Sequence, residues 1–278
     1  MFEIFKTLLL LSGTGGVITV ILIALKPITA KRFSARWQYY IWLVAMICMI
    51  LPVWKVIPNK EAQKILPRAV AETAPRASDN QTQNNTVINY DVPMEYREIQ
   101  IAGKTAIRIY DLIAYIWLGG MAVFLILAFG NYYYFLCKKR RSSICLSENE
   151  IFEQVKAELG IKRKIRVRIS RGTDSPMLVG TFFPVIYLPE NAADEITEKM
   201  VFRHELTHYR HGDLIYKWIT LFISAAHWFN PLVYLLSANI SEACEVFCDM
   251  SVIKEMDGKN RDLYMKTILN LAEKNGGK

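Results

Sequence analysis

The stretch Val201–Asp213 reads VFRHELTHYRHGD and contains the pattern H-E-x-x-H between His204 and His208. On a helix, residues four apart share a face, so both histidines can bind one metal ion. Glu205 projects beside them, where it can accept a proton from a water without being a ligand. Residues 193–211 contain no glycine or proline, as a helix requires. The stretch therefore predicts a helix that carries a catalytic metal site.

A third ligand is expected from the segment that follows. A catalytic zinc needs three protein ligands and keeps one position open. Glu245 and Asp249 are four residues apart and share a helix face. We assign Glu245 to Zn²⁺ and Asp249 to a position behind a ligand imidazole. Glu242, three residues earlier on nearly the same face, is the alternative ligand.

Other residues of ligand type are expected to have structural roles. Cys244 and Cys248 should point away from Glu245 and be buried as small side chains. His211 and His227 have no predicted partner in the metal site. The chain has five cysteines and none lies in its long polar segment, so no disulfide framework is indicated.

The composition favours a membrane protein. The chain has 278 residues, of which 52% are hydrophobic, and a formal net charge of +8. Three apolar segments predict transmembrane helices, over Thr7–Leu25, Trp37–Trp54 and Leu112–Leu136. The basic residues lie beside these segments, in a loop over residues 26–36 and in the run 138–141. Membrane borders explain them better than direct nucleic-acid binding does.

These basic clusters also predict the orientation, since cationic flanks stay in the cytoplasm. The N-terminus is then outside. The first span and its basic loop occupy residues 1–36, the second span 37–54, an extracellular loop 55–111 and the third span 112–137. Within the loop, Tyr96–Ile101 and Thr105–Ile109 are expected to form a β-hairpin. Residues 138–278 are expected to form a cytoplasmic domain, which the H-E-x-x-H pattern predicts to be a zinc metallopeptidase.

The cytoplasmic domain is expected to mix helices and strands. A capping box over Ser147–Glu150 should open a helix that stops at Gly160. Strands are expected over Lys164–Ser170, Met177–Gly180 and Val185–Leu188. Met177, Leu178, Val179 and Gly180 could be a sheet edge to which an extended peptide adds, or an ordinary covered edge.

The apolar segment after the motif is expected to fold back on itself. Two helices, about Asp213–Ala226 and Pro231–Lys254, should be separated at Asn230-Pro231. The resulting hairpin, at residues 213–240, would dip into the inner leaflet without crossing the membrane. An amphipathic helix over about Arg261–Lys274 should close the chain.

Together these motifs resemble the membrane metallopeptidase family of the bacterial β-lactam sensor-transducers. The matching stretches are His204–Asp213, His227–Pro231, Glu245–Asp249 and, before them, Gly180–Pro189. The resemblance implies an α-helical membrane protein with an α+β, zincin-like cytoplasmic domain. It also implies a gluzincin site, with His204, His208 and Glu245 on Zn²⁺, Glu205 as base and Asp249 behind a histidine. Asp213 matches a position of the family motif and is expected at a helix end or behind a ligand.

The resemblance further implies a multi-pass protein of the bacterial cell membrane that transmits a signal by proteolysis. The expected substrate is a cytoplasmic transcriptional repressor or the protease itself. The sequence leaves open whether the chain forms a homodimer. The full antibiotic sensors continue into another span and an extracellular penicillin-binding domain, which this sequence lacks, so it is a fragment or a shorter branch. The alternative is a non-catalytic membrane scaffold with a closed structural metal site that recruits Cys244 or Cys248.

Overall fold

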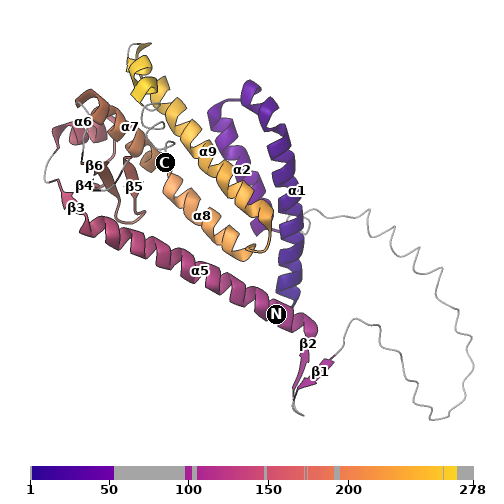
Figure 1. Cartoon of the computed structure of the whole chain (residues 1–278). Helices are drawn as coiled ribbons and strands as arrows, with labels where there is room; N and C mark the ends of the chain where they lie inside the picture. Colours follow the sequence, from indigo (N-terminus) through magenta and orange to yellow (C-terminus); the bar gives the residue numbers. More distant parts are fainter. Residues whose placement is uncertain are drawn as a thin grey trace, which may run out of the picture.

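The computed structural model describes residues 2–52, 98–101, 105–146, 149–171, 173, 175–190, 195–258 and 260–267. Its elements, shown in Figure 1, comprise long apolar helices, a two-stranded hairpin and a small α+β unit. The helices are α1 (Phe2–Arg32), α2 (Ala35–Ile50), α5 (Ile109–Arg141), α6 (Glu150–Glu158), α7 (Glu195–His211), α8 (Asp213–Ala226) and α9 (Pro231–Lys254). The strands are β1 (Glu98–Ile101), β2 (Thr105–Arg108), β3 (Ser143–Cys145), β4 (Arg166–Ser170), β5 (Met177–Val179) and β6 (Val185–Pro189).

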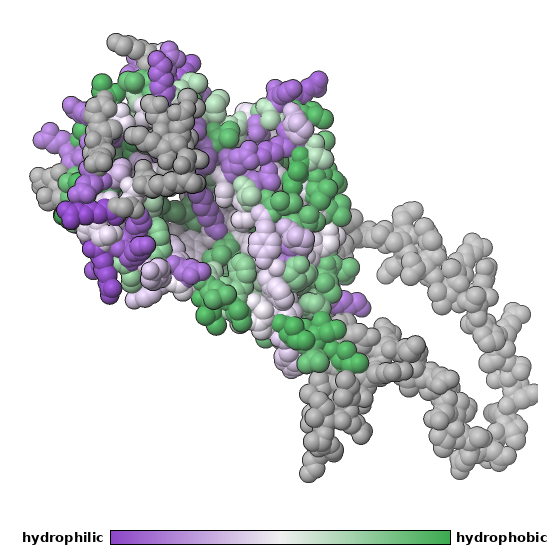
Figure 2. Space-filling view, in the orientation of Figure 1, coloured by the Kyte–Doolittle hydropathy of each residue, from purple (hydrophilic) through white to green (hydrophobic). Residues whose placement is uncertain are grey.

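Two of the predicted spans are long enough to cross a membrane. Within α1 and α5, the segments Ile4–Arg32 and Asp111–Arg141 meet that requirement by length and composition. Their apolar side chains stay largely exposed, for example Val17 at 60% and Ile126 at 69%. The core helix of a soluble protein would bury such residues. Figure 2 shows hydrophobic residues over the α1 side of the molecule and more hydrophilic ones over the α+β unit.

The second predicted span and its basic loop differ from expectation. α2 has 16 residues and ends at Ile50, with Leu51 as its C-cap before Pro52. A crossing needs roughly 20 residues, so α2 lacks the length that α1 and α5 have. Residues 26–32 belong to the last turns of α1, which continues through Pro27, so the predicted loop is short. Ser34 caps α2 by accepting a hydrogen bond from the backbone amide of Trp37.

The predicted β-hairpin before α5 is confirmed. β1 and β2 pair antiparallel, with Glu98 opposite Arg108 and Ile101 opposite Thr105. Most of the predicted extracellular loop, residues 53–97, lies outside the described residues.

The α+β unit contains a sheet of strand order β3-β4-β6-β5. β4 and β6 are parallel, whereas the two outer pairs are antiparallel. α6 and α7 share one core with the sheet, whose fully buried members are Val155, Ile186, Phe202 and Leu206. β5 is the edge strand beside α7, as the sequence predicted, but it ends at Val179. Gly180 lies in the following turn, with φ +89°.

The N-cap of α6 is not Ser147, the first residue of the predicted capping box. The N-cap is instead Asn149, whose side chain accepts from the amide of Phe152 at 2.8 Å. The same side chain donates to Glu198 of α7 at 2.7 Å. Asn149 therefore caps α6 and ties it to the motif helix, while Ser147 lies outside the described residues. Gly160 ends the helix region with φ +68°, as predicted.

The helical hairpin α8–α9 has the predicted bounds and packs along α1. At its turn, Asn230 Nδ2 donates to Ser12 Oγ of α1 at 2.8 Å, and the ring of Phe229 lies 6.4 Å from that of Phe5. Near its open end, Lys26 of α1 pairs with Glu242 of α9 at 2.5 Å. The hairpin thus runs beside α1 over most of its length, and its predicted dip into the inner leaflet stays a prediction.

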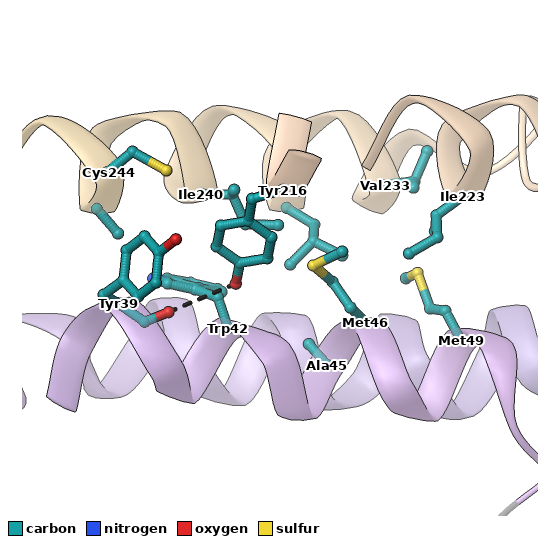
Figure 3. Close-up of a cluster of buried hydrophobic side chains, with 12 residues drawn as sticks. Tyr39, Trp42, Ala45, Met46, Met49, Tyr216, Ile223, Val233, Ile240 and Cys244 are labelled. Atoms are coloured by element: carbon teal, nitrogen blue, oxygen red, sulfur yellow. Dashed lines mark hydrogen bonds between the residues drawn. The ribbon is translucent and has the colours of Figure 1, made fainter. Parts of the chain in front are cut away.

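Close packing holds the hairpin against α1 and α2. The faces of α2, α8 and α9 share a buried cluster that includes Trp42, Met46, Tyr216, Leu236 and Ile240 (Figure 3). A Cβ atom on Gly15 would come within 2.3 Å of the Met49 side chain, and one on Gly16 within 2.8 Å of Leu232. Glycine at these two positions therefore lets α2 and α9 approach α1 closely.

Candidate metal centre

The link between α7 and α8 is one residue long. Gly212 adopts the left-handed conformation, with φ +77°, which costs glycine little. α8 begins immediately with Asp213, so the chain turns back and sets this carboxylate against His208 of α7. The motif helix and the membrane-side hairpin are therefore joined directly at the candidate site.

Three of the predicted ligand atoms converge. The Nε2 atoms of His204 and His208 lie 3.1 Å apart. Oε2 of Glu245, from α9, lies 3.2 Å from His208 Nε2 and 3.6 Å from His204 Nε2. Two imidazole nitrogens and a carboxylate oxygen are an ordinary donor set for a catalytic zinc. The predicted trio therefore comes together from two helices.

Behind His208 stands a buried carboxylate. His208 Nδ1 contacts Asp213 Oδ2 at 2.6 Å, and Asp213 is only 2% exposed. The other oxygen of Asp213 accepts from the hydroxyl of Tyr39, on α2, at 2.9 Å. Such a partner fixes the ring so that Nε2 faces the other ligands.

Behind His204 stands a pair of side chains. Its Nδ1 lies 2.8 Å from the hydroxyl of Tyr264 and 3.2 Å from Oδ1 of Asp249. Tyr264 also donates to Asp249 at 2.7 Å. Asp249 therefore lies where it was predicted, but it shares the imidazole with a tyrosine that the sequence analysis missed. Tyr264 comes from the helix over residues 260–267, and no local pattern marks it.

Cys248 lies against His204, although the sequence predicts that it points away from the metal site. It is buried, but its Sγ lies 3.7 Å from Nδ1 of His204 and 3.3 Å from the backbone oxygen of that residue. His204, His208 and Cys248 offer ligand atoms within 4.8 Å of one another. Cys248 follows Glu245 by three residues, and this spacing also shares a helix face. The thiol nevertheless contacts the Nδ1 side of His204, whereas Glu245 contacts Nε2.

The remaining predicted alternatives lie elsewhere. Glu242 pairs with Lys26 and does not approach the histidines. Cys244 is fully buried in the cluster between α2 and α9, as expected. His211 stacks on Phe247 with ring centroids 4.2 Å apart, and buried His227 contacts the Met49 carbonyl at 3.1 Å. Both histidines therefore have structural contacts, as predicted.

Glu205 is buried beside the convergent atoms, with 8% of its surface exposed. Burial raises the pKa of its carboxyl group, although the nearby histidines and a hydrogen bond from the Leu178 backbone oppose the rise. A cavity of about 430 Å³ opens next to it, lined by Met177, Leu178, His204, His208 and Glu245 among others. Of the predicted edge residues, Met177 and Leu178 line this cavity.

The charges around the two imidazoles suit a cation. Burial alone would lower the pKa of His208, but hydrogen bonds with Asp213, Cys248 and Glu245 raise it to about 11. The pKa of His204 is raised in the same way through Asp249, Cys248 and Glu245, against the effect of burial. Hydrogen bonds with both histidines lower the pKa of Glu245, although burial opposes this. Glu205, Asp213, Glu245 and Asp249 thus surround two histidines, and this excess of carboxylates fits a divalent metal ion.

Comparison with known proteins identifies the family of the chain. Residues 6–278 match the family described as BlaR1 peptidase M56. The chain is 25% identical over 263 residues to the regulatory protein BlaR1 of Bacillus licheniformis, covering 91% of this chain and 43% of that protein. It is 22% identical over 277 residues to the methicillin resistance mecR1 protein of Staphylococcus aureus, covering 96% of this chain and 46% of that protein.

The chain therefore spans about half the length of the curated relatives it matches. The family match covers nearly the whole chain and confirms the resemblance drawn from the motifs. Peptidase M56 is a metallopeptidase family, and the chain places possible metal ligands, His204, His208 and Cys248, close together. The chain belongs to the BlaR1 peptidase M56 family.

Proposed function

We propose that this chain is an integral-membrane zinc metalloendopeptidase with a cytoplasmic active site. The observation that carries the proposal is the convergence of His204 Nε2, His208 Nε2 and Glu245 Oε2, with each Nδ1 held from behind. This leaves the cavity side of the trio open for a water and a substrate carbonyl. An open position is what distinguishes a catalytic zinc site from a structural one.

The chemistry follows from the neighbouring groups. Bound Zn²⁺ would polarise the scissile carbonyl and lower the pKa of a bound water to about 7. Glu205 would accept the proton of the attacking water and deliver it to the leaving amine. Its burial supports this role, because a raised carboxyl pKa lies closer to neutral pH than that of an exposed glutamate.

The substrate would lie in the cavity beside β5. Met177 and Leu178 line the cavity, and the Leu178 backbone hydrogen-bonds to Glu205. An extended peptide placed along this edge would bring a carbonyl group to the base and the metal ligands together. Val179 and Gly180 lie beyond the cavity lining, so the productive edge would be shorter than predicted.

The membrane arrangement and the relatives' names support a signalling role. The site lies near the end of α1 where Lys26 pairs with Glu242, followed by the basic Lys31 and Arg32. Cationic flanks favour the cytoplasm, which would place the site there and the N-terminus outside. The named relatives are a regulatory protein and a methicillin resistance protein. We therefore propose a cytoplasmic transcriptional repressor, or the chain itself, as substrate.

One observation favours a second candidate function. The buried Cys248 thiol adjoins His204, so a closed site with thiolate coordination would make the protein a non-catalytic membrane scaffold. Glu245 Oε2 meets the Nε2 atoms of both histidines, whereas the thiol contacts His204 at Nδ1, 3.7 Å away, and this supports the catalytic arrangement instead.

The test compares Glu205→Gln with Glu242→Gln in the detergent-purified chain. Both changes remove a carboxylate, but Glu242 lies outside the site and pairs with Lys26. Cleavage of a mixed peptide library, read by mass spectrometry, should fall by about 10²–10⁴-fold in Glu205→Gln, the usual contribution of a general base. Zinc content should stay at wild-type level in both variants. Wild-type cleavage in Glu205→Gln would exclude this base, and zinc without any cleavage in the wild type would favour the scaffold.

A further inference from the structure

A tyrosine of α2 is hydrogen-bonded into the candidate metal centre. The Tyr39 hydroxyl donates to Oδ1 of Asp213 at 2.9 Å, and Oδ2 of the same carboxylate contacts His208 Nδ1 at 2.6 Å. Tyr39 is 5% exposed, Asp213 2% and His208 8%. Water therefore has little access to this chain of contacts, so its geometry depends on the helices that supply it.

The placement of the Tyr39 hydroxyl depends on α2. Figure 3 shows the ring extending from α2 toward α9, close to Cys244. The ring lies 5.1 Å from that of Tyr216 of α8 and 4.9 Å from that of Phe247 of α9, measured between centroids. The hydroxyl of Tyr216 donates to the backbone oxygen of Tyr39 at 3.4 Å. Tyr39 belongs to α2, and side chains of α8 and α9 contact it.

The pair of helices α1 and α2 is tied to the same site region. α1 and α2 are joined by a short connection at Phe33 and Ser34. Lys26 of α1 binds Asn239 and Glu242 of α9, and Glu242 is one turn before Glu245. A displacement of α2 relative to α8 would therefore act on the Tyr39–Asp213 bond, which crosses directly between these two helices.

We propose that Tyr39 is a positioning residue for the metal centre and that α2 acts on His208 through Asp213. Removing the hydroxyl would leave Asp213 with one fewer donor and allow the His208 ring to turn from its Nε2-inward orientation. Partners behind a ligand histidine typically contribute 10–100-fold to metal affinity, and Tyr39 acts one step farther away. The inference rests on the proposed metal site and adds a route by which α2 adjusts it.

The experiment compares Tyr39→Phe with Tyr234→Phe in the full chain in detergent. Both variants keep the ring and remove one hydroxyl, but that of Tyr234 donates to the backbone oxygen of Trp228 at 2.7 Å, whereas that of Tyr39 bonds to Asp213. Zinc affinity is measured by chelator competition, and the ligand geometry by the absorption spectrum of the Co²⁺-loaded chain. Tyr39→Phe should bind zinc roughly 3–10-fold more weakly and alter the spectrum, while Tyr234→Phe should match the wild type.

A double-mutant cycle tests the route. If Tyr39 acts through Asp213, Tyr39→Phe should cause no further loss of affinity in an Asp213→Asn background. Unchanged zinc affinity and Co²⁺ spectrum in Tyr39→Phe would overturn the inference, as would losses that add in the double variant. A wild-type chain that binds neither metal would instead overturn the proposed function, so the two failures are distinguishable.

Discussion

The two candidate ligand histidines are held from behind by the same residue types in two different arrangements. Behind His208 the contacts form a line, in which Tyr39 donates to one oxygen of Asp213 and the other oxygen meets the imidazole. Behind His204 they form a triangle, in which the Tyr264 hydroxyl touches both the imidazole and Asp249.

The two arrangements also differ in origin and exposure. The line is formed by α2 and α8, and its carboxylate is 2% exposed. The triangle is formed by α9 and the helix over residues 260–267, and the Asp249 side chain is 31% exposed. His204 therefore has two oxygen partners at Nδ1 besides the Cys248 thiol, and Asp249 is partly hydrated, whereas Nδ1 of His208 depends on one buried carboxylate. We infer that the line is the more fragile support and that it couples the site to α2.

The largest expected effect concerns the face of the imidazoles that meets the metal. Both supports contact Nδ1, so the proposed ligand faces are the Nε2 atoms, together with Glu245. Glu245→Gln should weaken zinc binding by more than the roughly 10–100-fold that loss of an outer partner costs. Cys248→Ser, a near-isosteric change at the Nδ1 side of His204, should cost less than tenfold.

Zinc affinity of the two variants, measured by chelator competition, decides between the arrangements. A larger loss in Cys248→Ser than in Glu245→Gln would identify the thiol as a ligand. The Nδ1 side of His204, and not the Nε2 side, would then face the metal. The thiolate would then also be visible as a charge-transfer band in the Co²⁺-loaded chain.

The next largest effect distinguishes the contacts behind His208 from those behind His204. Asp213→Asn should reduce zinc affinity by roughly 10–100-fold, because His208 loses the charge of the carboxylate that contacts its Nδ1. Asp249→Asn should reduce it less, because Tyr264 still lies 2.8 Å from His204 Nδ1. Equal losses, measured in parallel with secondary structure by circular dichroism, would show that the triangle has no redundancy.

Much of this site could be predicted because its signals are local. The spacing of His204, His208, Glu245 and Asp249 reflects helix periodicity, and the break at Asn230 separates α8 from α9. The parts that sequence reasoning missed depend on long-range contacts. Tyr39 lies 174 residues before Asp213, and Tyr264 lies 60 residues after His204. No periodic pattern links such pairs, since tertiary packing alone brings them together.

Local patterns also failed where tertiary contacts compete with them. Ser147–Glu150 fits a capping box, yet Asn149 caps α6 while its amide group also reaches Glu198. The prediction that Cys248 points away from Glu245 rests on the i,i+4 pair of Glu245 and Asp249. It does not include the i,i+3 pair of Glu245 and Cys248. A helix face is broad enough to hold both.

The smallest expected effect concerns how α7 is held on the His204 side. Arg203, next to His204, and Lys199 both bind Glu158 of α6. Burial would raise the pKa of Glu158, but hydrogen bonds from Lys199 and Arg203 outweigh it and hold the pKa below its ordinary value of 4.5. A lowered folded-state pKa gives stability that is present above pH 4.5 and is lost as the pH falls through the folded value.

Glu158→Gln should therefore destabilise the chain by at most about 1 kcal/mol near neutral pH, because the pair is partly exposed and screened by salt. The difference from wild type should shrink as the pH falls from 4.5 through the lowered pKa of the folded state. Thermal unfolding in detergent across pH measures it, with Glu153→Gln, which breaks an exposed pair with Lys156 inside α6, as control. Zinc affinity should stay unchanged in both variants, because the triangle holds His204 independently of this ion pair. A loss of affinity in Glu158→Gln alone would show that the placement of α7 against α6, and not the triangle, orients His204.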